Sequence, residues 1–497
     1  MEKAILILGA GLMQKPAILS AKELGLKTYV VDGNKNAVCA DLADEFCNID
    51  LKNRDELLEY AKQINWETGL SAVFTAGTDF SANVAYIAEK LGLPGHSYQA
   101  ALNSTDKVLM RKCFAEYGVS SPAFTEVTIY DLAVIKNEPE KFLKKHGFSE
   151  DNFPYVVKPC DNMGGRGCRM VNDTCEIYES IKTAISFSRT KRAIFEEYMD
   201  GREFSIDSLV SNGEVTITGF AERHICFPPY FIEMGHTMSA VLSQKDYNAL
   251  KSEFVQAINA LGLTNGVAKA DIKLTSNGPM IGEIAARLSG GYMSGWTFPY
   301  ASGINLTRQA ILLALGQKCE IPLGTDVKPE KTVAERAWIS IPGKISAIYG
   351  LDMAKKIDGV QDVLPRVNVG DEVVFPTNNV EKCGNIIAVS EDRETAIQNA
   401  QTAVSLIVIR LEKNNPKTDA FFNCEDSSYY DVPQAYTSNS FEFPDESSPD
   451  WNYRGIEQTL DLFTEITHCT YENIKDFSKN DEAFFRYLYR GGIQGLL

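Results

Sequence analysis

A glycine-rich segment with two cations is the first stretch whose residues could do chemistry. Residues 155–171 read YVVKPCDNMGGRGCRMV, in which Lys158 ends an apolar run and Arg166 stands among Gly164, Gly165 and Gly167. Glycines let a backbone approach a ligand closely and turn its N–H groups toward anions, and the two side chains add positive charge. Because a second apolar run follows, we expect a hairpin, either an ordinary one or one whose tip closes over nucleotide phosphates. It is not a Walker loop, since no Gly-Lys-Ser/Thr follows.

Two carboxylates further along the chain have the spacing of a metal site. The alternation in 268–274 (AKADIKL) predicts a strand with Asp271 on its polar face, and a turn at 276–279 leads to a second strand that carries Glu283. A hairpin would bring the two acids together, where they repel each other unless a cation lies between them. Hard oxygen ligands beside phosphates suit Mg²⁺, with Mn²⁺ as a substitute. The alternative is a hairpin with solvated charges.

Three acids around residue 200 could hold a nucleoside. Glu196 and Glu197 close an apolar run, and Glu203 lies seven residues beyond Glu196. They could meet an adenine amino group and ribose hydroxyls, or they could be the solvated end of a strand. Lys107 falls in the first turn of a predicted helix, where a cation is slightly unfavourable, so an anionic ligand could be its reason.

Other polar residues have ordinary structural interpretations that we favour. Asp79 follows a predicted strand and could contact substrate, but we expect it to cap a helix. Glu233 and His236 fall in the segment 228–239, which we expect to be a loop, and His236 would ordinarily have no special role there.

The elements that must position these residues alternate between strands and helices. Apolar runs at 4–8, 28–31, 47–49, 72–75 and 92–94, with helices between them, predict a parallel sheet of the doubly wound kind. The dinucleotide fingerprint is incomplete because Gln14 stands in place of the third glycine, so an NAD-dependent oxidoreductase is the weakest interpretation. Helices are expected at about 108–117 and 174–187, and strands at 193–199, 204–210 and 215–222.

Composition excludes several classes of protein. A chain of 497 residues with 44% hydrophobic and 23% charged residues is typical of a globular protein of three or four domains. The net charge of −17 argues against nucleic-acid binding, and no apolar run approaches a membrane span. The 11 cysteines show no CxxC pair, and the start MEKAILILGAG leads into a strand–glycine–helix pattern rather than a cleavage site. We therefore expect a cytoplasmic protein with reduced thiols.

Five short motifs in one order resemble the ATP-grasp superfamily. They are TDK at 105–107, VVKP…MGGRG at 156–167, FEEYMDGRE at 195–203, AKAD at 268–271 and GEIAARLSGG at 282–291. The residues before them resemble the pre-grasp domain of biotin carboxylase and carbamoyl phosphate synthetase, and residues 331–412 resemble the small C-terminal domain of that superfamily. The fold class so implied is α/β and α+β. Its domains are a Rossmann-like pre-ATP-grasp domain at 1–103, a two-lobed ATP-grasp domain at 104–325 with a glycine-loop lobe at about 120–195, a C-terminal α+β domain at 326–412 and an acidic, partly helical appendage at 413–497.

The resemblance implies a role for each matched residue. Lys107 and Lys158 would hold ATP phosphates under the Gly164–Gly167 loop, and Glu196, Glu203 and the backbone of Glu197, Tyr198 and Met199 would hold adenine and ribose. Asp271 and Glu283 match metal-binding positions, and the catalytic pair Lys269 and Arg287 would steady the transferred phosphoryl group. One position departs from the pattern, because many members have Glu-x-Asn where this chain has Glu283-Ile284-Ala285. One ion is therefore better supported than two.

Within the superfamily, the segments PPYFIEMGHTMSAVL and EIAARLSGG look most like the bacterial L-amino acid ligases. That implies an ATP-dependent carboxylate–amine ligase acting through an acyl phosphate on an amino acid or small acid. The substrates would lie near five residues: Asp79, Glu233, His236, Gly290 and Gly291. The competing interpretations are a formate- or bicarbonate-activating transferase or carboxylase of the same superfamily and a non-catalytic nucleotide-binding module. Biotin dependence is not expected, since no Met-Lys-Met motif occurs.

The tail beyond residue 412 is strongly acidic. Residues 421–452 are rich in Ser, Tyr, Asp, Glu and Pro and predict an extended excursion. Residues 453–485 regain helical spacing and predict a packed helical appendage. It could cover the grasp cleft, mediate self-association as a homodimer, or bind a partner, and the sequence leaves all three open.

Overall fold

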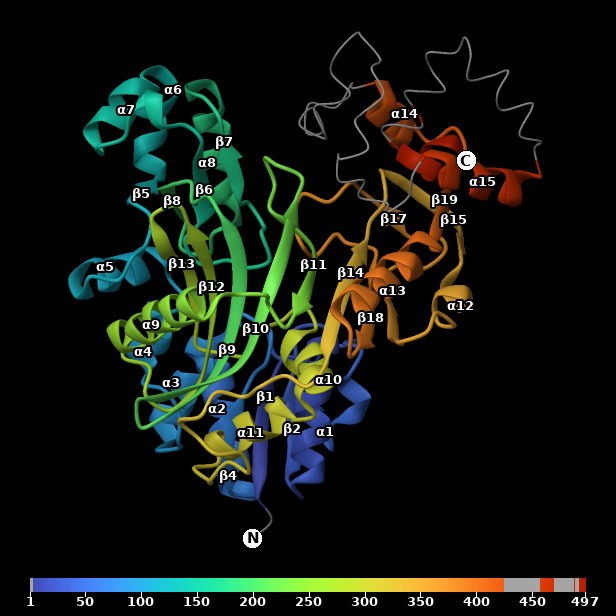
Figure 1. Cartoon of the computed structure of the whole chain (residues 1–497). Coiled ribbons are helices and arrows are strands. Elements are labelled where there is room, and N and C mark those ends of the chain that lie inside the picture. The colour runs from blue at the N-terminus through green and yellow to red at the C-terminus, as the bar shows by residue number, and fades with distance from the viewer. Residues whose placement is uncertain (1–2, 424–455, 469–486, 488–490) are drawn as a thin grey trace. The chain divides into compact units, whose positions relative to one another are not determined.

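The chain passes several times between two units. The computed structural model describes residues 3–423, 456–468, 487 and 491–497. The first unit comprises residues 1–163, 172–223 and 238–331, and the second comprises 164–171, 224–237 and 332–497. Helices and strands are labelled in Figure 1.

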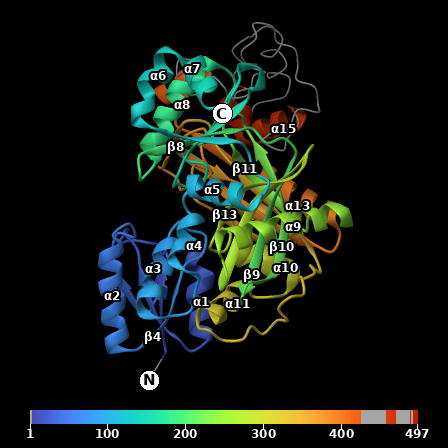
Figure 2. The same ribbon diagram turned by 90° about the vertical axis from the view of Figure 1, so that its left-hand side faces the viewer.

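A parallel sheet of order β3-β2-β1-β4 opens the first unit. Its strands and helices are β1 (Ala4–Leu8), α1 (Lys15–Glu23), β2 (Lys27–Val31), β3 (Glu45–Cys47), α2 (Arg54–Glu67), β4 (Leu70–Phe74), α3 (Ser81–Leu91) and α4 (Tyr98–Asn103). The residues of β1 are buried on both faces, as expected where helices cover both sides of a parallel sheet. Figure 2 shows α2 and α3 side by side along this sheet. The strand predicted at 92–94 is wrong, because Gly92 adopts φ +67° and ends α3 there.

The next part of the first unit holds helices and an antiparallel sheet from residues 106–197, without the glycine loop at 164–171. Asp106 accepts hydrogen bonds from the N–H groups of Val108 and Leu109 and so caps α5 (Lys107–Tyr117), which begins one residue before the predicted helix. An antiparallel sheet of order β5-β8-β6 carries an aromatic core beneath α8. Its elements are β5 (Phe124–Thr128), α6 (Leu132–Asn137), α7 (Pro139–Lys145), β6 (Tyr155–Pro159), α8 (Thr174–Phe187) and β8 (Arg192–Glu197).

A second antiparallel sheet of the first unit has the order β13-β12-β9-β10. The strands are β9 (Arg202–Ser211), β10 (Glu214–Cys226, whose last three residues belong to the second unit), β12 (Gly266–Thr275) and β13 (Gly278–Ala285). Phe204 and Ile206 of β9 and Ala268, Ala270 and Ile272 of β12 are fully buried on one face, which packs against α9 (Gln244–Leu261) in one hydrophobic core. Most polar side chains of these two strands lie on the opposite face. Beyond β13, a π-helix (Met293–Thr297) and the helices α10 (Phe298–Ser302) and α11 (Leu306–Ala314) complete the unit.

The second unit is also mixed α+β. Its sheet strands are β11 (Ile232–Met238), β14 (Thr332–Trp338), β16 (Val360–Pro365) and β18 (Gly384–Ser390), with α13 (Arg393–Ser405) packed on β14 and β18. The smaller elements are β7 (Arg169–Val171), β15 (Gly343–Tyr349), α12 (Leu351–Ala354), β17 (Glu372–Val373), β19 (Val408–Leu411) and α14 (Pro416–Asn423). The loop predicted at 228–239 is therefore wrong over β11, whose seven residues are all buried. Polar side chains inside the strand hid it, because burial there depends on partners far away in the sequence.

Only parts of the tail can be compared with the prediction. Phe421 and Phe422 are buried in α14, so the extended excursion does not begin at residue 421. Residues 424–455 and 469–486 lie outside the described residues. Helix α15 (Ile456–Thr467) agrees with the helical spacing predicted from residue 453. Among the helices that the structure describes, none is long and apolar enough to cross a membrane. The α/β and α+β fold class predicted from the sequence is confirmed.

Candidate active site

The polar face of the β13-β12-β9-β10 sheet gathers most of the predicted site residues. The register sets Asp271 opposite Glu283 on one side and opposite Ser205 on the other. Lys269 lies opposite Asp207, two residues along. Because side chains alternate along a strand, all of these groups project from the same face. Local alternation predicted the polar face of β12, and strand pairing adds the polar groups of β9 and β13 to it.

Asp271 and Glu283 are partly buried, with side chains 19% and 28% exposed, and are held ionised by cations. Burial alone would raise both pKa values. Arg223 and Lys269 outweigh it at Asp271 and lower its pKa to about 2, and Lys107 and Lys269 lower the pKa of Glu283. Nη1 of Arg223 lies 3.0 Å from Oδ1 of Asp271, and Nζ of Lys107 lies 3.6 Å from Oε2 of Glu283.

These carboxylates fit a magnesium ion. Although Arg223 is close to Oδ1 of Asp271, that buried oxygen accepts no hydrogen bond. The described residues offer no cluster of three or more acidic, His or Cys side chains as a metal cage. Mg²⁺ commonly takes only one or two carboxylates and completes its shell with phosphate and water. Asp271 and Glu283 would thus hold the ion beside a nucleotide.

Glu196 lies in a buried three-residue cluster rather than at a solvated strand end. Its side chain is inaccessible, with Nε of Arg111 2.7 Å from Oε1 and Nζ of Lys158 2.8 Å from Oε2. Burial opposes ionisation of Glu196, but Arg111 and Lys158 lower its pKa. Arg111 also donates to the carbonyl of Gly282 over 2.7 Å, which ties α5 to β13. Lys107 is likewise buried and donates to the carbonyl of Asn162 over 2.9 Å.

Of the residues after β8 that were expected to hold the nucleoside, Glu203 has close cationic partners. Glu203 has Nη1 of Arg223 2.5 Å from Oε1 and Nζ of Lys273 3.7 Å from Oε2. Lys273 also donates to the backbone carbonyl of Met199 over 3.0 Å. Glu197 is exposed and Tyr198 is 40% exposed, so their side chains do not enter the cluster around Glu196.

The loop after β13 is held by residues that lie far away in the sequence. Arg287 is buried and donates to the carbonyl of Leu288 over 3.0 Å. Asp207 accepts from the backbone N–H of Ser289 over 2.9 Å and from its hydroxyl. Burial raises the pKa of Asp207, against the effect of these hydrogen bonds. A Cβ at Gly290 would lie 3.4 Å from the carbonyl oxygen of Gly77, so Gly290 permits a close approach of two backbones.

Asp79 does not cap a helix, and that prediction is wrong. Phe80 is the N-cap of α3, whereas Asp79 pairs with Arg189, whose Nη2 lies 3.3 Å from Oδ2. Burial raises the pKa of Asp79 to about 6, although Arg189, Lys107 and Arg287 act to lower it. Asp79 therefore lies within electrostatic range of the polar face.

The glycine loop belongs to the second unit. Gly164, Gly165 and Gly167 have φ of +70°, +76° and +69°, a conformation that favours glycine. The carbonyl of Gly164 accepts from the N–H of Asn379 over 2.9 Å. The loop lies between β6 and β7, as the two flanking apolar runs predicted. Arg166 is half-buried in it. The role of the loop over phosphates stays a prediction.

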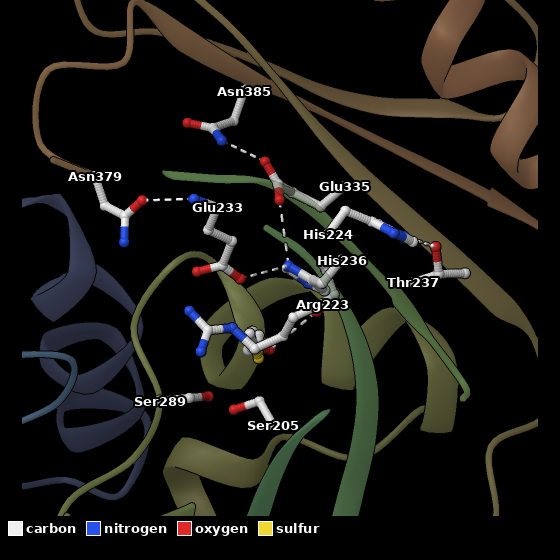
Figure 3. A network of polar contacts seen from close by, with 12 residues as sticks. Ser205, Arg223, His224, Glu233, His236, Thr237, Ser289, Glu335, Asn379 and Asn385 are labelled. Atoms are coloured by element: carbon white, nitrogen blue, oxygen red, sulfur yellow. Dashed lines mark hydrogen bonds and ion pairs between the residues drawn. The ribbon is translucent and has the colours of Figure 1, made fainter. Parts of the chain in front are cut away.

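His236 is not a loop histidine. Figure 3 shows it between two carboxylates: Nδ1 lies 3.2 Å from Oε2 of Glu335 and 3.8 Å from Oε1 of Glu233. Asn385 donates to the other oxygen of Glu335, and the N–H of Glu233 donates to Asn379 over 2.7 Å. His236 is completely buried. This cluster lies within the second unit, and its substrate role stays a prediction.

Sequence reasoning missed four charged residues: Arg111, Asp207, Arg223 and Glu335. Arg111 follows Lys107 by four residues, a spacing that puts both on one helix face and could have been noticed. Asp207 lies on the polar side of the alternating run FSIDSLV, and Arg223 ends a similar run. Glu335 gave no local signal, because its partners come from two other strands.

Comparisons with known proteins agree with this geometry. Residues 151–295 match the ATP-grasp domain, residues 18–95 the ATP-grasp N-terminal domain, and residues 337–412 the L-amino acid ligase C-terminal domain 2. The protein y4rH of Sinorhizobium fredii, uncharacterised, is 25% identical over 369 residues, 73% of each chain. Carnosine synthase 1 of Homo sapiens is 22% identical over 340 residues, which are 64% of this chain but only 40% of that protein.

Among solved structures, the L-amino acid ligase from Bacillus licheniformis has a TM-score of 0.70 and 20% identity, over 83% of this chain and 99% of that one. At this identity the likeness shows the fold. The chain thus carries an ATP-grasp domain, preceded by an ATP-grasp N-terminal domain and followed by an L-amino acid ligase C-terminal domain 2.

Proposed function

We propose that this chain is an ATP-dependent carboxylate–amine ligase that forms an amide or peptide bond. The observation that carries the proposal is the polar face on which Lys107, Lys269 and Arg287 accompany the ionised Asp271 and Glu283. Converging cations beside two partly buried carboxylates suit a nucleoside triphosphate with a divalent ion. The match of residues 337–412 to a domain named for L-amino acid ligases supports an amino acid as one substrate.

The proposed reaction has two steps. A substrate carboxylate oxygen attacks the γ-phosphorus of ATP, so that ADP leaves and an acyl phosphate forms. The amine of the second substrate then attacks the acyl carbon, inorganic phosphate leaves, the nitrogen loses a proton and an amide remains. Activation is needed because a carboxylate does not expel oxide, and ATP supplies the better leaving group.

The residues of the polar face act by position and charge. Bound to Asp271 and Glu283, Mg²⁺ would supply positive charge to phosphate oxygens. Lys269 and Lys107 add fixed cations to the same face, and Arg287 lies where a developing oxyanion could be stabilised. The Asp207–Ser289 hydrogen bonds hold the Arg287 segment in place. Glu196 forms ion pairs with Arg111 and Lys158 and is a buried acceptor suited to an adenine amino group.

The direct test incubates the purified protein with MgATP and a panel of amino acids, alone and in pairs. ADP release and a product mass equal to two substrates minus water are expected for at least one pair. Formate and bicarbonate belong in the panel, and turnover with them alone would favour the transferase or carboxylase interpretation. Glu283→Gln should bind less metal and lose turnover. Lys62→Gln is the matched control, because Lys62 is an exposed residue of α2 paired only with Glu59. No ADP release with any combination would refute the ligase proposal.

A further inference from the structure

Arg223 links two acids that the superfamily resemblance assigns to different parts of the nucleotide. It ends the alternating part of β10, and its Nη1 lies 2.5 Å from Oε1 of Glu203 and 3.0 Å from Oδ1 of Asp271. The arginine side chain is only 11% exposed. Its charge is therefore weakly screened by solvent and acts at close range on the metal-binding carboxylate.

Position 285 departs from the superfamily pattern on the same face. Ala285 follows Glu283 by two residues along β13, so both side chains project to one side, and the register sets Ala285 opposite Lys269. A methyl group cannot ligate a metal. The polar face thus lacks one oxygen or amide ligand but carries two cations, Lys269 and Arg223, at Asp271.

We propose that Arg223 supplies, as a fixed cation, the charge that a second metal ion would bring, so that this chain binds its nucleotide with a single Mg²⁺. The inference rests on the proposed function. A guanidinium is always ionised and presents a planar fork to carboxylate and phosphate oxygens. Arg223 thereby positions Asp271 for one metal ion, and its positive charge repels a second one.

The metal count can be measured without turnover. Mn²⁺ binding is followed by electron paramagnetic resonance in the presence of saturating ADP, with wild type, Arg223→Met, Arg223→Lys and the double variant Arg223→Met/Ala285→Asn. Wild type should bind one Mn²⁺ per nucleotide. Arg223→Met should lower the affinity for Mn-ADP about tenfold, because the polar face then has one cation fewer to offset the phosphate charge. Arg223→Lys should recover part of that loss, and the double variant should bind two ions.

Arg202→Met is the matched control. Arg202 lies on the neighbouring strand β9 and pairs with Glu222 over 2.7 Å, but it is about half exposed. Its substitution should change neither the ion count nor the affinity. Two ions in wild type, or one ion in the double variant, would overturn the proposal. So would an Arg223→Met variant that keeps wild-type affinity.

The outcomes separate this inference from the proposed function. If wild type binds no nucleotide, the ligase proposal fails first. If wild type binds Mn-ADP with two ions, the ligase proposal stands and the role of Arg223 falls. Circular dichroism of each variant shows whether it is folded, and Arg223→Lys keeps the test decisive if Arg223→Met does not fold.

Discussion

Removal of Arg111 should destabilise the protein far more than removal of its neighbour Lys112. Arg111 is fully buried, and among the residues that the structure describes its partner Glu196 pairs with one other cation, Lys158. Breaking a buried ion pair from one side costs about 3–5 kcal/mol, because an ion is left without compensation. Lys158 still offsets part of the charge, but the Gly282 carbonyl also loses its donor. For Arg111→Met we therefore expect a loss of about 3–5 kcal/mol in the free energy of unfolding.

The assay is urea denaturation of Arg111→Met, Glu196→Gln and the double variant. If their m-values equal that of wild type, the shift in the midpoint gives the change in the free energy of unfolding. Each single substitution should be costly, and the two costs should not add, because the double variant removes both charges of one pair. Lys112→Met is the control. The Lys112 side chain is 62% exposed, and its Nζ lies 4.0 Å from Oε2 of Glu126. Its substitution should therefore lower the free energy of unfolding by less than about 0.5 kcal/mol.

The reasoning would be refuted by an Arg111→Met variant as stable as Lys112→Met. It would also be refuted by additive costs of Arg111→Met and Glu196→Gln, since independent sites do not share a buried charge. Binding of ADP gives a second readout. If Glu196 accepts from adenine, Arg111→Met should weaken ADP binding as well as stability.

Three further predictions follow from the same contacts. Because the pKa of Asp79 is raised from 3.8 to about 6, the folded protein binds the extra proton, so the free energy of unfolding should fall as pH rises from 4 to 6. The fall should reach about 2–3 kcal/mol and vanish in Asp79→Asn, as measured by urea denaturation at several pH values. Ser289→Ala should cost about 1–3 kcal/mol in thermal denaturation, because Asp207 loses a buried donor. Gly201→Ala should cost several times more than Gly213→Ala, as compared by chemical denaturation. Both have positive φ, but only at Gly201 would a Cβ strike a backbone carbonyl, and equal costs would contradict this.

Local sequence signals were sufficient for elements whose stability is local. Helix α8 (Thr174–Phe187) has the predicted bounds, because Asp173 caps it and its apolar residues recur at helical spacing. Helix α5 ends at Gly118, whose φ is +68°. The run 268–274 within β12 alternates strictly, so its two faces could be assigned before the sheet was known.

The failures occur where distant residues decide the outcome. Strand β11 looked like a loop because Glu233 and His236 are polar, but Glu335 from β14 lies 3.2 Å from Nδ1 of His236, and Asn379 accepts from the N–H of Glu233. Asp79 looked like a helix cap, and only tertiary structure brings Arg189 to it. In both places a buried polar group has its partner more than 90 residues away, and periodicity carries no information about such pairs.

The cations beside Asp271 and Glu283 decide how these carboxylates respond to pH. Burial alone would favour their protonated forms, but Arg223 and Lys269 lower the pKa of Asp271 to about 2, and Lys107 and Lys269 lower that of Glu283. The carboxylates proposed as metal ligands are therefore ionised throughout the neutral range before any metal arrives, and their protonation cannot regulate metal binding there. Asp79, with a pKa of about 6, lies within electrostatic range of this face. Burial also raises the pKa of Asp207 on the same face. An inflection near pH 6 in nucleotide affinity should belong to Asp79 and disappear in Asp79→Asn. Its persistence in that variant would refute the assignment to Asp79.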